Sequence, residues 1–187
     1  MNRVFIAFMA FILLGCNNSN PPSTNSMLWE FHAKNNQIAF DNACQPLLIN
    51  YQEILKGVQA KDTAFLFNAA KNLSTLMDSF PVFTSSKDSA LNDHIKHGLT
   101  NIQSEIQGLM AETSWFEMYK AANMISIQMI HLLGEAGYGK NNIYIFHTSF
   151  EQQEDGFYWF GINKTARDPY HPEQKELVEA PSILQEP

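Results

Sequence analysis

Apolar residues recur every three or four positions along four stretches in the middle of the chain. This spacing places them on one face of an α-helix, so each stretch predicts an amphipathic helix. The four stripes consist of Leu47, Leu48, Tyr51, Ile54, Leu55 and Val58; Leu66, Ala69, Leu73, Leu76 and Phe80; Leu91, Ile95, Leu99, Ile102, Ile106 and Leu109; and Met118, Ala122, Ile125, Met129 and Leu132. Amphipathic helices with short connections bury their stripes against one another, which predicts an all-α domain built as a four-helix antiparallel bundle.

Residues at the ends of these stretches agree with helix boundaries. Pro46 is acceptable in the first turn of the first helix. Asp62 and Ser114 are good N-cap residues for the second and fourth helices. Gly134 or Gly137 is expected to end the fourth helix, because glycine readily adopts the left-handed conformation found after helices.

The pattern changes after the fourth helix. Residues 142–147 (NIYIFH) and 157–162 (FYWFGI) are dense in aromatic and β-branched side chains and predict two strands. Joined by a turn, they would form a hairpin lying over one end of the bundle, as a small β-like C-terminal cap. The residues expected to hold this cap together are Tyr144, Trp159, Pro169 and Tyr170. Residues 172–187 are rich in proline and predict a mostly disordered tail.

The first sixteen residues carry a targeting signal. Arg3 is their only charge, and it precedes an apolar run, Val4 to Leu14, that is too short to span a bilayer. The run ends in Leu-Leu-Gly-Cys16, which resembles the bacterial lipobox, where signal peptidase II cuts before a diacylglycerol-modified cysteine. We therefore expect residues 1–15 to be a lipoprotein signal peptide, and Cys16 to carry the acyl chains (palmitate and similar fatty acids). The alternative is an ordinary secretory peptide or the start of a membrane segment.

The lipobox also indicates the organisation and location of the chain. Residues 16–26 combine the lipidated cysteine with a polar, flexible tether, residues 27–42 form an N-terminal arm, and residues 43–171 form the helical domain with its cap. Asn17 after the cysteine, with no acidic residue close behind, is typical of lipoproteins sent to the outer membrane and facing the periplasm. We expect membrane attachment through the N-terminal lipid in the cell envelope.

Charge and cysteine content narrow the choice of partners. The chain has 12 basic and 19 acidic residues, a net charge of −7, and no basic cluster. This balance argues against nucleic acid and against electrostatic docking on anionic lipid. If Cys16 is lipidated, Cys44 has no partner within the chain and no disulfide framework exists. A lone Cys44 could be a ligand or an intermolecular bridge, but is most simply a buried apolar residue.

Histidines supply the first candidate chemistry. His94 and His97 lie three residues apart on one helical face and could bind Zn²⁺ or Cu²⁺, although two ligands do not complete a site. The alternative is a solvated helix face. The chain contains no G-x-S-x-G, no H-E-x-x-H and no phosphate-binding glycine loop, so we predict that it is not an enzyme.

A second pattern links the C-terminal half to a family. Tyr144 lies in the first predicted strand, Gly156-Phe157-Tyr158-Trp159 follows, and Asp168-Pro169-Tyr170 comes nine residues after the tryptophan. Over roughly Leu47 to Glu179 the chain resembles the DUF3347 family, a domain of unknown function in the envelope of Bacteroidetes. That domain occurs alone or fused to periplasmic adaptor subunits of metal-efflux pumps. The resemblance implies an envelope protein as partner.

The chain also departs from this family at its chemically active positions. Thr148-Ser149-Phe150 stands where the family has Cys-Pro-Met, and Lys175, Val178 and Glu179 stand near its final Met-x-x-Cys-Gly. The family's cysteines and methionines look like ligands for soft metals such as Cu(I). The resemblance therefore implies a divergent member in which the scaffold is kept and the thiol and thioether site is lost.

Two hypotheses for function follow. The first is a non-enzymatic, lipid-anchored periplasmic binding or accessory module without a cofactor, associated with an envelope transport or metal-handling complex. The alternative is a metallochaperone-like protein that binds a harder metal ion through His147 and His171, which flank the lost site, and through the His94/His97 pair.

Overall fold

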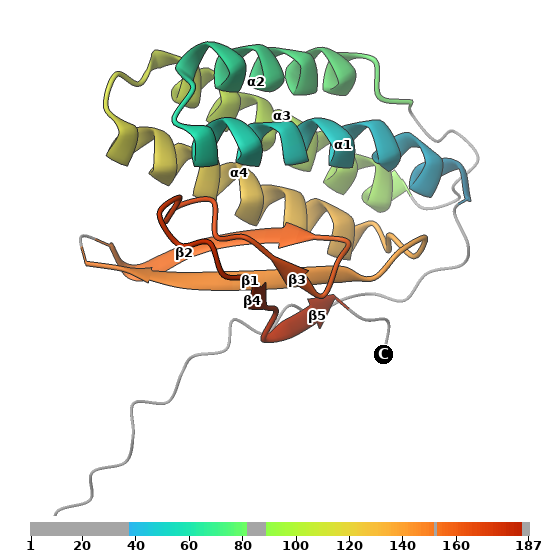
Figure 1. The fold of residues 1–187 in the computed structure, drawn as a ribbon. Coiled ribbons are helices and arrows are strands. Elements are labelled where there is room, and N and C mark those ends of the chain that lie inside the picture. Colours follow the sequence, from blue (N-terminus) through green and yellow to red (C-terminus); the bar gives the residue numbers. More distant parts are fainter. Residues whose placement is uncertain (1–37, 82–88, 152, 185–187) are drawn as a thin grey trace, which may run out of the picture.

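The computed structural model describes residues 38–81, 89–151 and 153–184. Four helices are followed by short antiparallel sheets at the C-terminal end (Figure 1). The elements are α1 (Ile38–Ala60), α2 (Thr63–Asp78), α3 (Ser89–Ala111), α4 (Trp115–Glu135), β1 (Ile143–Phe150), β2 (Gln153–Gly161), β3 (Thr165–Ala166), β4 (Val178–Glu179) and β5 (Ser182–Leu184). The predicted signal peptide, tether and most of the predicted arm lie outside the described residues. Within the part of the chain that is described, no helix is both long and apolar enough to cross a membrane.

The predicted helix caps are confirmed. Asp62 accepts a hydrogen bond from the backbone N–H of Phe65 at 3.0 Å, and Ser114 accepts one from that of Glu117 at 3.3 Å. These bonds satisfy N–H groups that have no partner within the first turn of a helix. After α4, Gly137 has a φ of 70°, the left-handed conformation that ends many helices.

The first helix begins earlier than its sequence pattern indicates. The prediction that an arm extends to residue 42 and that Pro46 lies in the first turn is wrong, because α1 starts at Ile38 and Pro46 lies inside it. A proline there removes one helical hydrogen bond and costs about 3 kcal/mol. The extra turns bury Phe40 and Cys44 completely, which offsets that cost through about 1.5–3 kcal/mol for the phenylalanine alone.

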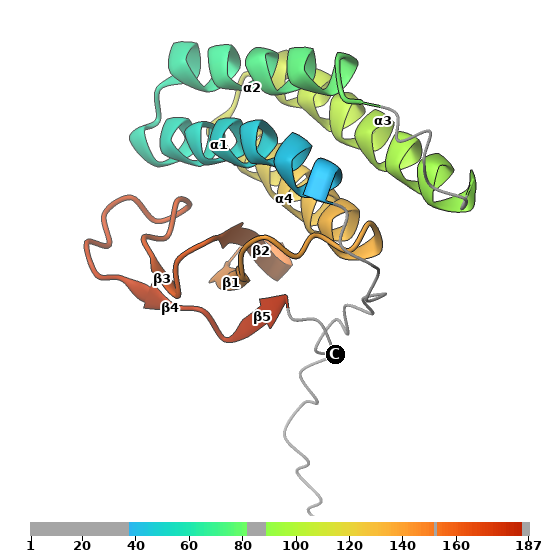
Figure 2. The ribbon, with the colours of Figure 1, turned by 90° about the vertical axis from the view of Figure 1, so that its right-hand side faces the viewer.

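The helices share one apolar core, into which most of the predicted stripe residues point. α1 packs along α2, and α3 packs along α4. Gly57 allows the first of these contacts, because a Cβ at this position would come within 2.8 Å of the Cα of Leu66. α2 and α3 lie on the side of the molecule away from the sheet, so the sheet rests against α1 and α4 (Figures 1 and 2).

The cap is more extensive than predicted and lies elsewhere. β1 and β2 form the predicted hairpin, and β5 adds a third strand in the order β2-β1-β5. The sheet runs along the helices and does not lie over one end of them (Figure 1). The prediction of a mostly disordered tail is wrong for residues 178–184, because β4 pairs with β3 and β5 pairs with β1. Short-range sequence patterns do not reveal these strands, since their partners lie 12 to 41 residues earlier in the chain.

One glycine lies at an irregularity in the pairing of the hairpin strands. Gly156 has a φ of 66°, and the register between β1 and β2 shifts near this point. A Cβ at Gly156 would overlap the carbonyl oxygen of Thr148 and the Nε2 atom of His147. The close approach of two backbones at this irregularity therefore requires a residue without a side chain.

Side chains of the helices cover the outer edge of β2. The N–H of Tyr158 donates to Asn123 Oδ1 at 2.7 Å, and the N–H of Phe160 donates to the Tyr51 hydroxyl at 3.3 Å. Gln52 Nε2 donates to the carbonyl of Phe160 at 2.9 Å. An uncovered strand edge presents unpaired backbone groups, so these bonds fix the sheet to the helices and protect its edge.

Tyr51 is central to this contact. Its ring stacks on that of Phe160, with centroids 4.1 Å apart and planes 3° apart. Ser126 donates to the carbonyl of Ala122 at 2.9 Å, which leaves the Tyr51 hydroxyl as the donor in its 2.7 Å bond to Ser126. The hydrogen bonds therefore run in one direction, from Phe160 through Tyr51 and Ser126 to α4. Burial raises the pKa of Tyr51 well above its ordinary value, so the hydroxyl keeps the proton that it donates.

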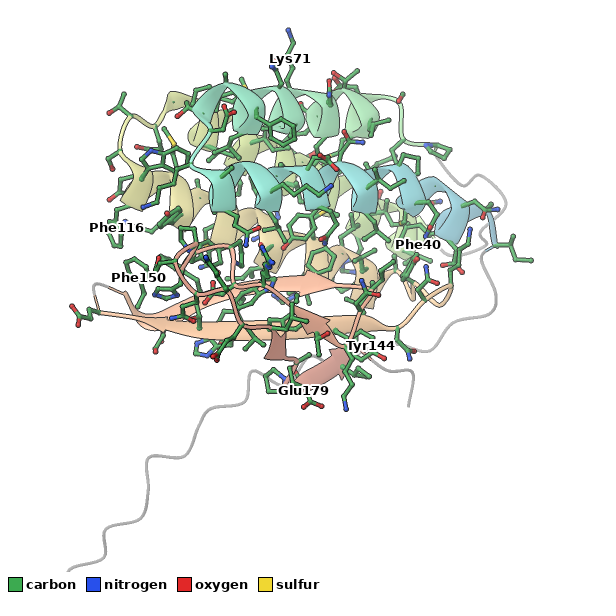
Figure 3. All side chains as sticks on the ribbon, in the orientation of Figure 1. Phe40, Lys71, Phe116, Tyr144, Phe150 and Glu179 are labelled. Carbon is green, nitrogen blue, oxygen red and sulfur yellow. The ribbon has the colours of Figure 1, made fainter. Side chains whose placement is uncertain are left out.

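Aromatic rings pack one face of the cap. Trp159 stacks on Phe146 with centroids 5.3 Å apart, and Tyr170 meets Trp159 edge to face at 6.0 Å. Of the four residues expected to pack the cap, Trp159, Pro169 and Tyr170 are buried, whereas Tyr144 is half-buried. Further rings extend the cluster toward the start of α4, where Phe116 and Phe150 meet with centroids 5.8 Å apart (Figure 3).

Candidate functional site

A groove lies between α1 and the segment that follows β2. This segment lies beside the C-terminal half of α1 (Figures 1 and 2). The groove is open to solvent on one side and has a volume of about 310 Å³. Its α1 wall is a stripe with helical spacing, formed by Gln52, Leu55, Lys56 and Gln59. The opposite wall and floor are formed by Trp159, Phe160, Gly161, Ile162, Asn163, Thr165, Ala166, Arg167 and Pro169. A volume near 300 Å³ is at the lower end of the range for sites that bind small molecules.

The lining of the groove is basic, although the chain as a whole is acidic. Its lining contains Lys56 and Arg167 and no acidic residue. The Nζ atom of Lys56 lies 2.6 Å from Glu53 Oε1 just outside the lining, which partly neutralises this lysine. Arg167 is exposed and has neither an ion pair nor a hydrogen bond to any described side chain. Its guanidinium is therefore available to an anion in the groove.

The wall that carries Arg167 is held by the C-terminal tail. β3 pairs with β4, and the N–H of Ala180 donates to the carbonyl of Lys164 at 3.0 Å. Lys164 also pairs with Glu179 at 2.5 Å; this bond raises the pKa of the lysine and lowers that of the carboxyl group. Both side chains are exposed, so water screens the pair, and the backbone bonds contribute most of the order.

The floor of the groove contains a buried polar group without a partner among the described residues. Trp159 is 1% exposed, and its indole N–H has no hydrogen-bond partner among the described residues. The hydroxyl of Tyr119, in the same aromatic cluster, is also buried without a hydrogen-bond partner among the described residues. A buried donor without an acceptor costs about 1–3 kcal/mol, so each is a weak point in an otherwise well-packed region.

A second polar cluster joins Asp168, His171 and Thr148. Asp168 is 2% exposed; its Oδ1 accepts from the backbone N–H of Tyr170 at 2.8 Å, and its Oδ2 lies 2.9 Å from His171 Nδ1. The Thr148 hydroxyl lies 3.3 Å from the same nitrogen. The bond from the Tyr170 N–H to Asp168 closes an Asx turn around Pro169, and this turn orients the buried Tyr170.

This cluster resembles a nucleophile, base and acid only in composition. A histidine that relays a proton uses one ring nitrogen for the hydroxyl and the other for the carboxylate. In this structure Thr148 and Asp168 both contact Nδ1 of His171, so the geometry suits a turn and not a proton relay.

The predicted histidine ligands lie apart. Nε2 of His147 is 3.0 Å from the carbonyl oxygen of Asp155, and its ring packs against Tyr158. Successive residues of a strand point to opposite faces, so His147 faces away from Thr148 and from His171 beside it. His94 and His97 are exposed on α3, with His94 Nδ1 4.0 Å from Glu135 Oε2.

The structure brings no set of predicted metal ligands together among the described residues. These residues contain no group of three or more histidine, cysteine, aspartate or glutamate side chains placed to hold a metal ion. Cys44 is buried, and burial raises the pKa of its thiol, so the protonated form dominates. Cys16, the predicted lipidation site, lies outside the described residues.

Sequence reasoning missed the groove. Gln52, Lys56 and Gln59 do recur with helical spacing beside an apolar stripe, but such a stripe usually faces solvent. Nothing in the sequence pairs it with residues 161–169, about one hundred positions later.

Comparison with known proteins gives no relative. No family model matches the chain, and neither a curated protein nor a solved structure matches it. The resemblance to the DUF3347 family therefore stays a prediction.

Proposed function

We propose that this chain is a non-enzymatic, lipid-anchored binding module on the periplasmic side of the outer membrane, and that its binding site is the groove between α1 and the segment after β2. The observation that carries the proposal is the groove itself, with a volume of about 310 Å³ and a basic and amide-rich lining in an acidic chain. A concave site with a few polar groups is the usual form of a small-molecule site.

The rest of the molecule supports a binding role. In this proposal the four helices form an antiparallel bundle that acts as a rigid support, and the lipid on Cys16 holds it at the membrane. The arrangement of Thr148, His171 and Asp168 does not suit a proton relay, because both oxygens meet the same histidine nitrogen, and this agrees with a non-enzymatic role. Association with an envelope transport or metal-handling complex rests on the DUF3347 resemblance.

The anchor is tested by labelling cells with a palmitate analogue. We expect label in the wild-type chain and in the membrane fraction, and neither in Cys16→Ser. Equal labelling of the two proteins, or membrane association without Cys16, would contradict the lipid anchor.

The groove is tested by a thermal-shift screen of small charged and neutral metabolite-like compounds. Gln59→Trp places a bulky ring against the groove from α1, while Asn68→Trp adds the same ring at an exposed position of α2. Compounds that raise the Tm of the wild type and of Asn68→Trp, but not of Gln59→Trp, support the groove as the site. A screen whose only active compounds stabilise all three proteins equally would overturn it.

A further inference from the structure

We propose that the groove selects a small organic oxyanion, a carboxylic acid or a phosphate monoester, and that Arg167 is the residue that determines this specificity. This inference rests on the groove being the binding site and adds the chemical class of its ligand. It depends on how charge, hydrogen-bonding groups and apolar surface are distributed over the lining.

Charge is the first argument. The chain carries 19 acidic and 12 basic residues, yet the groove lining contains two cations and no acid. A cationic ligand would meet Arg167 without a carboxylate in the lining to compensate for it, whereas an anion would gain from Arg167 and, to a smaller extent, from Lys56, which already pairs with Glu53. Like charges placed together are unfavourable, so the lining selects against cations as well as for anions.

The two cations differ in whether they already have a partner, which is the second argument. Lys56 already has Glu53 at 2.6 Å, but Arg167 has no ion pair or hydrogen bond with any described side chain. A guanidinium presents its N–H donors in a planar fork that matches two oxygens of a carboxylate or phosphate. Arg167 also projects from a segment tied down by β3, β4 and the Asx turn at Asp168. The backbone that carries Arg167 is therefore held in place before a ligand binds.

The remaining lining defines the body of the ligand. Gln59, Asn163 and Thr165 offer both donors and acceptors, while Leu55 and Ile162 add apolar surface. A bare inorganic ion would use none of the apolar surface. The groove therefore fits an anionic group attached to a short organic body of mixed polarity.

The test is an NMR titration of the full chain, labelled with ¹⁵N and purified in a non-ionic detergent. The probes are benzoate, phenyl phosphate, the neutral analogue benzamide, and inorganic phosphate. The indole N–H signal of Trp159, in the groove wall, reports on the site; Trp159→Phe assigns it, and Trp115 on α4 is the internal reference. We expect benzoate or phenyl phosphate to shift the Trp159 signal, and the tighter of the two to identify the acid.

Variants decide the role of Arg167. We expect Arg167→Ala to weaken binding of the oxyanion by about tenfold or more and Arg167→Lys to recover only part of it, because an ammonium group does not supply the fork. Lys71→Ala removes the same charge from the outer face of α2, on the side of the molecule away from the sheet (Figure 3), and should leave binding unchanged. Arg167 is exposed, so its variants should keep the wild-type Tm.

The outcomes separate this inference from the proposed function. If benzamide binds as tightly as benzoate and Arg167→Ala has no effect, the oxyanion assignment is overturned while the groove remains the site. If inorganic phosphate binds as tightly as phenyl phosphate, the organic body is overturned. If none of the four probes shifts the Trp159 signal, the inference fails, and the thermal-shift screen with Gln59→Trp then decides whether the groove binds anything.

Discussion

Replacing Tyr51 with phenylalanine tests how the sheet is attached to the helices. The substitution keeps the ring that stacks on Phe160 at 4.1 Å and removes only the hydroxyl group. That group accepts from the backbone N–H of Phe160 at 3.3 Å and donates to Ser126 at 2.7 Å. The hydroxyl of Tyr51, a residue of α1, therefore links the edge of β2 to α4.

The size of the effect follows from what the hydroxyl leaves behind. Tyr51 is 0% exposed, so water cannot replace it in the native structure. The Phe160 N–H becomes a buried donor without an acceptor, which costs about 1–3 kcal/mol, and the lost bond to Ser126 adds about 0.5–1.5 kcal/mol. Phenylalanine recovers part of this because no hydroxyl needs to be buried. We expect the free energy of unfolding to fall by about 2–3 kcal/mol.

The assay is urea denaturation of the wild type and the variant, with the free energy extrapolated to water. Tyr144→Phe is the matched control, because Tyr144 is half-buried and its hydroxyl has no hydrogen bond to the described residues. The free energy of unfolding of Tyr144→Phe should stay within about 0.5 kcal/mol of the wild-type value. Hydrogen exchange adds a local readout, since Tyr51→Phe should speed exchange of the Phe160 amide more than that of amides in α2.

Two results would refute this reasoning. The first is a loss below about 0.5 kcal/mol for Tyr51→Phe, which would mean that the Phe160 N–H finds another acceptor or that β2 does not press its edge against the helices. The second is an unchanged exchange rate at Phe160 despite lower stability, which would place the effect elsewhere in the core. A double-mutant cycle with Ser126→Ala then measures the Tyr51–Ser126 bond alone.

Three further predictions concern the same sheet. Trp159→Ala should lower the free energy of unfolding by about 3–5 kcal/mol, because the ring is buried, and a near-neutral thermal unfolding result would mean that the ring is exposed. Gly156→Ala should lower the free energy of unfolding, measured by urea denaturation, by more than about 1 kcal/mol, because φ is 66° and a Cβ would overlap the neighbouring strand. Gly108→Ala on α3 is the control: its Cβ would meet nothing within 4 Å, so it should raise the free energy of unfolding by about 0.5–1 kcal/mol. Burial raises the pKa values of Tyr51 and Tyr170 in the folded state above 10.0, so unfolding releases protons above this pH. The free energy of unfolding should therefore fall as the pH rises past 10, and it should fall less in Tyr51→Phe. A free energy of unfolding that stays constant up to pH 11 would contradict the burial of these hydroxyls.

Some features of the candidate site depend on residues close together in the sequence, and others on contacts between distant segments. The lipobox-like pattern before Cys16 and the histidine pair on α3 are local patterns, so both can be recognised in the sequence alone. The groove was not predictable, because its walls come from residues 52–59 and 159–169, and only packing brings these together. The Asp168, His171 and Thr148 cluster likewise depends on a strand meeting a turn twenty residues later.

The four helices, two of their caps and the two long strands can be predicted from the sequence alone. Each of these depends on neighbours within a few residues, such as the Asp62 side chain and the Phe65 amide, or on an apolar period that the chain carries wherever it packs. Three other features depend on packing in the folded chain: α1 begins eight residues before Pro46, the tail forms β4 and β5, and β2 docks by its edge. These features take their free energy from burial and hydrogen bonds between distant segments, which outweigh local preferences that point the other way.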